Sequence, residues 1–173
     1  GVFFRNTPAQ VETNVDGHAQ NVAGVMISTA KAAPGVAPEA RLYSAGAALE
    51  SERNRQAQEC LTAQHVALQN GDDVRAINFS FGEPLSLDIR PNAKLDGNAL
   101  LTLCIDWSAN VHNVLYTIAG NQGSGGIPIP TDNFNGVNIS FSRQQDGVYR
   151  YLDVSNLGSV FTGVDSRLVG LET

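Results

Sequence analysis

Charged residues are scarce in this chain, and the cationic ones are outnumbered. Only 16% of the 173 residues are charged, and 11 basic residues face 17 acidic ones, for a net charge of −6. A protein that binds nucleic acid needs a cationic face to displace counterions from phosphates, so we expect no nucleic-acid partner. No apolar run is long enough to span a bilayer and no basic-then-apolar leader opens the chain, so we expect no membrane partner either.

Cysteine is rarer still, with only Cys60 and Cys104 in the chain. The two form no C-x-x-C pair, and no pair of histidines and acids has the spacing of zinc ligands. We therefore expect neither a metal site nor a cofactor. Both cysteines fall inside predicted helices, and we interpret them as two small buried thiols.

The whole chain is 42% hydrophobic, which is typical of one globular domain. Predicted helices and strands alternate along its first two thirds. This alternation predicts an α/β fold: a three-layer domain with a mostly parallel sheet flanked by helices. The predicted helices cover 18–31, 51–70 and 96–110, and the predicted strands cover 40–47, 74–81 and 113–120.

Apolar stripes on the second and third helices predict which side of each helix faces the core. The run 113–120 is almost continuously apolar, which predicts a strand covered on both faces. The expected core stripes are Ala57, Cys60, Leu61, Gln64 and Leu68 in the second helix, and Leu100, Leu103, Cys104, Trp107 and Val111 in the third.

The amino-acid composition changes after residue 120. Residues 120–136 are rich in Gly, Pro and Asn and predict a loop, and short strands are predicted at 137–142, 148–154 and 158–164. The glycines of this loop suggest a phosphate-binding turn, but Pro128 and Pro130 prevent a helix from starting directly after it.

Three polar features could meet at one edge of the predicted sheet. Ser80-Phe81-Gly82 and Gly120-Asn121 leave the carboxyl ends of two strands, where ligands of open parallel sheets bind. His18 stands at the start of the first helix, with Asp16 as the predicted N-cap. By itself, each feature also has an ordinary structural explanation, as a helix-terminal residue or a loop residue. His65 and His112 are interpreted as packing or capping residues.

Four segments, in order, resemble the subtilisin-like serine proteases. "DGHAQNVAG" is similar to the catalytic-histidine segment H-G-T-H-V-A-G, and "GVAPEARLYS" to G-V-A-P-x-A-x-L-Y. "AINFSFGEP" is similar to V-I-N-x-S-L-G, and "IAGNQG" to A-A-G-N-x-G. The resemblance covers roughly residues 1–145.

The resemblance implies a role for each matching residue. His18 matches the general base, and Asn121 matches the side-chain amide that donates to the oxyanion. Ser80, Phe81 and Gly82 match the wall that pairs with an extended peptide. It further implies a peptide or protein substrate, a serine endopeptidase activity, and a secreted or periplasmic location.

The match also shows departures. Ala19-Gln20-Asn21 replaces the family's Gly-Thr-His after the histidine, and the sequence contains neither an aspartate-bearing strand upstream of His18 nor a Gly-Thr-Ser segment. We therefore expect residues 1–173 to be a single, incomplete subtilisin-like catalytic domain, inactive by itself. We also expect its unpaired sheet edge to associate with missing segments of a parent chain or with a second copy.

Two other functions remain open at this stage. The chain could be a non-catalytic subtilisin-like module that binds an extended peptide by strand addition, because the residues after His18 have changed. It could also be an α/β module that binds a small molecule around the glycine loop at 120–126.

Overall fold

The structure, a computed structural model, describes residues 3–4, 17–45, 55–80, 82–120, 128–139, 143–145 and 148–150. The chain forms two compact units, Gly1–Leu49 and Glu50–Thr173. The strand predicted at 158–164 and the predicted cap Asp16 lie outside the described residues. Among those that are described, no helix is long and apolar enough to cross a membrane.

The first unit contains helix α1 (Gly17–Ile27) and two short parallel strands, β1 (Phe3–Phe4) and β2 (Ser44–Ala45). The helix predicted at 18–31 is present but ends at Ile27, because the chain turns back over its last carbonyls. The amide of Gly35 donates to the oxygen of Ser28 at 2.7 Å, and that of Ala37 to the oxygen of Met26 at 2.8 Å. A Cβ on Gly35 would lie 2.5 Å from the Ser28 nitrogen, so this return requires glycine.

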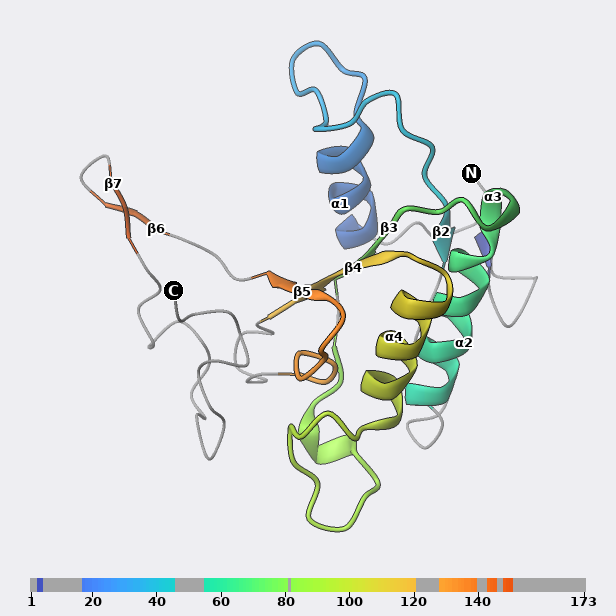
Figure 1. Cartoon of the computed structure of the whole chain (residues 1–173). Helices are drawn as coiled ribbons and strands as arrows, with labels where there is room; N and C mark the ends of the chain where they lie inside the picture. The colour runs from blue at the N-terminus through green and yellow to red at the C-terminus, as the bar shows by residue number, and fades with distance from the viewer. Residues whose placement is uncertain are drawn as a thin grey trace. The chain divides into compact units, whose positions relative to one another are not determined.

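A three-stranded parallel sheet forms the centre of the second unit (Figure 1). Its strands are β3 (Ala76–Phe79), β4 (Leu115–Ala119) and β5 (Val137–Ile139), in the order β3-β4-β5. Phe79 pairs with Ile118, and Ile118 with Asn138. The predicted α/β class with a parallel sheet is confirmed. The strand predicted at 40–47 is reduced to β2, which pairs with β1 and not with this sheet.

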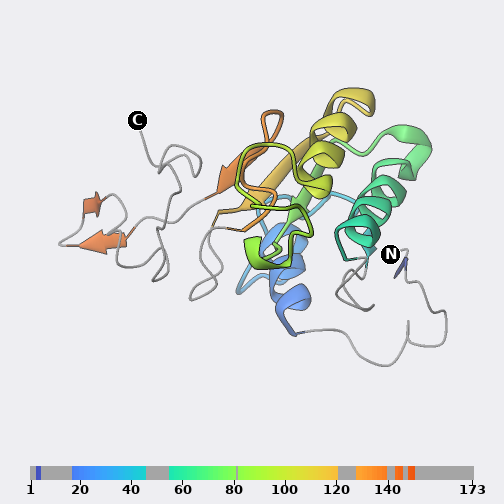
Figure 2. The same cartoon turned by 90° about the horizontal axis from the view of Figure 1, so that it is seen from below.

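Two helices, α2 (Arg55–Ala67) and α4 (Leu100–Val111), lie side by side and pack against β3 and β4 (Figures 1 and 2). A four-residue segment, α3 (Gln69–Asp72), follows α2, and Asn70 and Gly71 within it take left-handed backbone angles. Helix α2 therefore ends at Ala67, three residues before the stop that the sequence predicts at Asn70-Gly71. The main buried side chains between helices and sheet are Ala63, Ala67, Ile77, Phe79, Leu101, Ile105, Tyr116 and Ile118.

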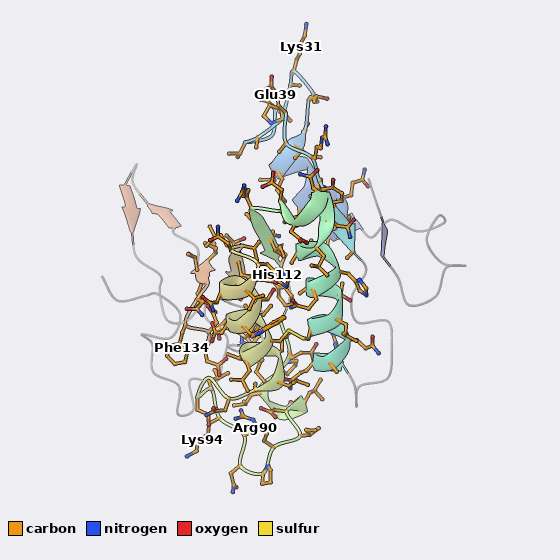
Figure 3. The ribbon with its side chains drawn as sticks, turned by 45° about the vertical axis from the view of Figure 1, so that its right-hand side comes forward. Lys31, Glu39, Arg90, Lys94, His112 and Phe134 are labelled. Atoms are coloured by element: carbon orange, nitrogen blue, oxygen red, sulfur yellow. A yellow bond between two sulfur atoms is a disulfide. The ribbon has the colours of Figure 1, made fainter. Side chains whose placement is uncertain are left out.

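Cys60 and Cys104 form a disulfide that joins α2 to α4, the yellow bond in Figure 3. The interpretation of two free buried thiols is therefore wrong. Sequence separation concealed the pairing, because the two cysteines are 44 positions apart and meet only when the two helices pack together. The amide nitrogen of Gln64 lies 3.3 Å from the Cys104 sulfur and adds a polar contact at the same place.

The predicted core stripes of both helices are correct at the cysteines, since Cys104 is buried and Cys60 packs against the core cluster, but are largely wrong elsewhere. In α2 the buried residues are Glu59, Ala63 and Ala67, whereas Leu61 and Leu68 are exposed. In α4 the predicted stripe is 52–54% exposed at its four apolar positions, and the buried face consists of Leu101, Thr102, Cys104, Ile105 and Ser108.

The polar residues on the buried face of α4 explain why this face, and not the predicted stripe, points to the core. The hydroxyl of Ser108 lies 2.7 Å from that of Tyr116, and Thr102 donates to a carboxylate oxygen of Asp132 at 2.7 Å. A polar side chain can be buried when it finds such a partner, and periodicity alone does not reveal the partner. The strand at β4 is also not covered evenly, since Tyr116 and Ile118 are buried while Leu115 is 45% exposed.

The second unit continues with an antiparallel pair, β6 (Arg143–Gln145) and β7 (Val148–Arg150). Strand β5 lies within the predicted 137–142 and β7 within the predicted 148–154, while β6 was not predicted. A short 3-10 helix (Leu85–Leu87) follows β3.

Candidate functional site

The predicted peptide-binding wall begins at the carboxyl end of β3. Ser80 accepts a hydrogen bond from the side-chain amide of Asn78 at 2.5 Å, and Thr117 on β4 donates to the amide oxygen of Asn78 at 3.3 Å. The side chains of the two strands are thereby linked just before their carboxyl ends. Phe81, between Ser80 and Gly82, lies outside the described residues.

The loop after β4 leaves the same edge of the sheet, because β3 and β4 are neighbouring parallel strands. Gly120, its first residue, is buried and donates its amide to the oxygen of Ile139 at 2.8 Å. Asn121, the predicted oxyanion donor, follows directly but lies outside the described residues. So does the rest of 121–127, on which the small-molecule hypothesis depends.

Gly82 is held tightly against the returning part of this loop. A Cβ at this position would lie 2.5 Å from Cβ of Pro128 and 2.9 Å from the oxygen of Ile129. Glu83 and Ile129 exchange two backbone hydrogen bonds, both 2.9 Å long, and form an isolated antiparallel bridge. The end of the wall and residues 128–129 therefore form one packed unit, which only glycine at position 82 permits.

His18 occupies the first turn of α1 in the first unit, and its neighbours 17–20 are all exposed. This is the position that the sequence predicts, at the start of a helix.

A cluster of three charged side chains lies directly behind the wall. Glu83 and Glu59 are both fully buried, and Arg55 is one third exposed. The Arg55 Nε atom forms an ion pair with Glu83 and lies 3.5 Å from Glu59. Burial, followed by the hydrogen bond and the negative charge of Glu83, raises the pKa of Glu59 to about 9. Glu59 is therefore protonated at neutral pH.

A hollow of about 340 Å³ opens beside this cluster, between the first turns of α2 and α4. Its walls are largely apolar. Another side is formed by the ion pair of Asp88 and Arg90, in which Oδ2 of Asp88 lies 2.7 Å from Nη2 of Arg90. The residues lining it include Arg55, Glu83, Leu87, Ile89, Leu100 and Leu103.

Two aspartates fix the segment that follows the bridge. Asp132, almost fully buried, accepts the amide of Gly97 at 2.8 Å as well as the hydroxyl of Thr102. Asp106 on α4 accepts the amides of Phe134 and Asn135, both at 2.8 Å. Helix α4 thereby anchors the chain on the far side of residues 128–129.

The remaining histidines are placed differently from each other. His112 caps the end of α4, lies 3.0 Å from Oε1 of Gln64 and packs edge-on against Trp107, so its interpretation as a packing and capping residue is confirmed (Figure 3). His65 is exposed on α2. Within the described ranges, no group of three or more His, Cys, Asp or Glu side chains is placed to hold a metal ion.

Sequence reasoning did not single out Arg55, Glu59, Glu83 or the two aspartates. One signal was present: Arg55 and Glu59 are four residues apart, the spacing that brings oppositely charged side chains together on a helix. Glu83 also follows the Ser-Phe-Gly motif directly, but nothing in the sequence shows that its side chain turns inward.

Comparison with known proteins supplies the family. A search of curated protein sequences and a search of solved structures each found no match to the chain. A model of the subtilase family, peptidase S8, matches residues 4–151, which is most of the chain. This range contains all four segments in which the sequence resembles that family. The chain therefore belongs to the subtilase family of serine proteases.

Proposed function

We propose that this chain provides the central part of a serine endopeptidase that hydrolyses peptide bonds by a Ser/His/Asp mechanism. His18 acts as the general base, Asn121 as the oxyanion donor, and Ser80, Phe81 and Gly82 as the wall that binds an extended peptide. Membership of the subtilase family is the observation that carries the proposal. The pairing of β3 with β4, whose carboxyl ends precede Gly82 and Gly120 at one edge of the sheet, supports it.

The chemistry needs each of these residue types. A serine hydroxyl attacks a peptide carbonyl only when a base removes its proton, and His18 would take that proton and pass it to the departing amine. Negative charge then develops on the carbonyl oxygen, where the amide of Asn121 would donate a hydrogen bond. An extended peptide pairs with the backbone of the wall, so its scissile bond is held in register.

We further propose that the chain of 173 residues does not cut peptides by itself. The sequence contains no Gly-Thr-Ser segment to supply the nucleophile. In subtilisin, loss of the serine lowers kcat by on the order of 10⁶, whereas loss of the oxyanion asparagine lowers it by roughly 10² to 10³. A base and an oxyanion donor therefore cannot compensate for a missing nucleophile.

The test combines binding with cleavage. A fluorescent extended peptide should bind the chain saturably and stay intact over many hours. In a longer chain that also carries the aspartate strand and the Gly-Thr-Ser segment, His18→Ala should lower kcat by at least about 10⁴, and Asn121→Ala by roughly 10² to 10³. Unchanged kcat in either variant would remove that residue from the mechanism.

A second function, peptide binding without any catalysis, is favoured by one observation. Ala19, Gln20 and Asn21 replace the family residues next to the histidine, and a module that only binds peptide does not need those residues. The longer chain separates the two functions. If it carries all three catalytic groups, binds the peptide and still leaves it intact, the chain is a binding module.

A further inference from the structure

The buried cluster behind the wall holds more negative charge than positive. Glu59 and Glu83 are fully buried, and the only cation that contacts them within the described part of the chain is Arg55. Two ionised carboxylates against one guanidinium would leave an unbalanced negative charge on side chains that are fully buried. Buried charges of this kind are tolerated only when they are paired or neutralised, so the cluster must retain one proton.

The charged side chains described around the cluster do not supply a second cation. Across the hollow, Arg90 is already engaged by Asp88 and by Asp96, at 2.7 and 2.8 Å. The first turns of α4, Leu100–Ile105, carry no ionisable side chain because Cys104 is in the disulfide, and neither does β3. Among the described residues, the proton balance is therefore set by Arg55, Glu59 and Glu83.

Glu83 connects this cluster to the wall. Its side chain points to Arg55 on α2, while its backbone makes both hydrogen bonds of the bridge to Ile129. Gly82, the preceding residue, is packed against Pro128. Movement of the Glu83 side chain therefore also moves the adjacent Gly82, which belongs to the wall that would contact a peptide.

We propose that Glu59 and Glu83 are positioning residues. While the Arg55–Glu59–Glu83 cluster holds one proton, it keeps Gly82 and Glu83 against Pro128 and Ile129, in the geometry that an extended peptide requires. When that proton is lost, repulsion between the two carboxylates opens the Glu83–Ile129 bridge and weakens peptide binding. The consequence for peptide binding rests on the proposed function, whereas opening of the bridge does not.

The raised pKa of Glu59, about 9, sets the conditions of the test. Amide hydrogen exchange at Glu83 and Ile129 is measured in the whole chain from pH 7 to pH 10 and expressed as protection, corrected for the intrinsic pH dependence of exchange. Protection should fall by up to about tenfold per pH unit as the pH rises toward the pKa and should level off above it, because below the pKa only the opened form releases the proton. In Glu59→Gln it should stay constant, because glutamine keeps a neutral hydrogen-bond donor in the same place.

Two further variants make the result decisive. Glu83→Gln leaves one carboxylate for Arg55 and should also remove the pH dependence, which protects the test against poor folding of a single variant. Glu39→Gln, an exposed site in the first unit, should behave as the unmodified chain does. Equal protection at pH 7 and pH 10 in the unmodified chain, or the same loss in Glu59→Gln, would overturn the proposal.

Binding of the fluorescent peptide over the same pH range separates this proposal from the proposed function. Binding that weakens together with protection, and no longer does so in Glu59→Gln, supports both. Loss of protection without any peptide binding at pH 7 supports the opening of the bridge and rejects the peptide-binding wall. Binding that stays constant while protection falls rejects the positioning role.

Discussion

At the scale of single residues, Glu59 is the residue whose burial has the clearest consequence for stability. Its pKa is about 9 in the folded chain, against an ordinary value of 4.5. Below pH 4.5 the carboxyl is protonated in both the folded and the unfolded chain, so its contribution to the free energy of unfolding is fully present there. Between 4.5 and 9 only the unfolded chain releases the proton. The free energy of unfolding should therefore fall by up to about 1.4 kcal/mol per pH unit across this window.

The first prediction follows from this loss of stability with rising pH. Glu59→Gln should unfold at a higher denaturant concentration than the unmodified chain near pH 8, with a smaller difference near pH 5, because glutamine has no proton to lose. Urea unfolding at pH 5, 6.5 and 8 measures the difference, and Glu39→Gln at an exposed site is the control. A difference that is independent of pH would show that Glu59 is already ionised in the folded chain.

Gly82 gives the second prediction, which concerns packing rather than charge. In Gly82→Ala the new Cβ would lie 2.5 Å from Cβ of Pro128, so the bridge or the wall must shift. We expect a loss of about 1–3 kcal/mol in unfolding free energy, typical of overpacking, and weaker peptide binding.

Gly24→Ala is the matched control for this substitution. Gly24 lies inside α1 with nothing within 4 Å of its Cβ position, so alanine there should be neutral or stabilising by about 0.5–1 kcal/mol. Urea unfolding and peptide titration of both variants give the comparison. If the two alanines act alike, the close contact at Gly82 has no energetic role.

At the scale of helices and strands, the sequence predicts where elements lie better than which way they face. The helices at α1, α2 and α4 and the parallel pairing of β3 with β4 follow from apolar periodicity and from alternation, whereas the pairing of β5 with β4 was not predicted. The rotation of α4 does not, because it depends on Ser108 meeting Tyr116 and on Thr102 meeting Asp132. Both partners, Tyr116 and Asp132, lie outside the helix, so the pattern within the helix cannot contain these pairings.

The candidate site shows the same division. Ser80 and Gly82 could be selected from the sequence, because a motif and a strand end coincide there. Glu59 could not, since a glutamate among polar helix residues normally faces solvent and only the fold brings it to Glu83. A motif identifies residues that would contact a substrate, whereas the residues that support them from behind depend on tertiary packing.

The third prediction concerns the disulfide between α2 and α4. Cys60 and Cys104 are 44 positions apart, and closing a loop of this length restricts the unfolded chain. Replacing both cysteines by alanine should lower the unfolding free energy by about 2–4 kcal/mol. Bonds of this kind persist in oxidising compartments, which agrees with the secreted or periplasmic location that the family resemblance implies.

Reductant provides the control for this prediction. Dithiothreitol should lower the stability of the unmodified chain toward that of the double alanine variant and should leave the variant unchanged. Thermal unfolding followed by circular dichroism, with and without reductant, measures both effects. Equal stability of the unmodified chain in the two conditions would mean that the two sulfurs are not bonded in solution.

At the scale of the whole molecule, the buried core belongs to one of the two compact units. Every side chain of the core cluster comes from residues 63–129, whereas none of the described side chains of residues 17–45 is buried. His18, the proposed base, is therefore carried by the unit with little buried apolar surface. The wall and Gly120 are carried by the unit with the sheet, the helices and the disulfide.

The fourth prediction tests this asymmetry. A polypeptide of residues 50–173 should fold by itself and unfold cooperatively, because it retains the whole core cluster and the Cys60–Cys104 bond. A peptide of residues 1–49 should show little helix alone, since α1 has 11 residues and isolated helices shorter than about 12–15 residues are marginal in water. Circular dichroism on each polypeptide measures its helix content.

If mixing the two restores helix in the shorter one, the second unit supplies the surface that orders α1 and His18. A cooperative transition in residues 1–49 alone would instead mean that the first unit has a core of its own, and the base would then be positioned independently of the wall.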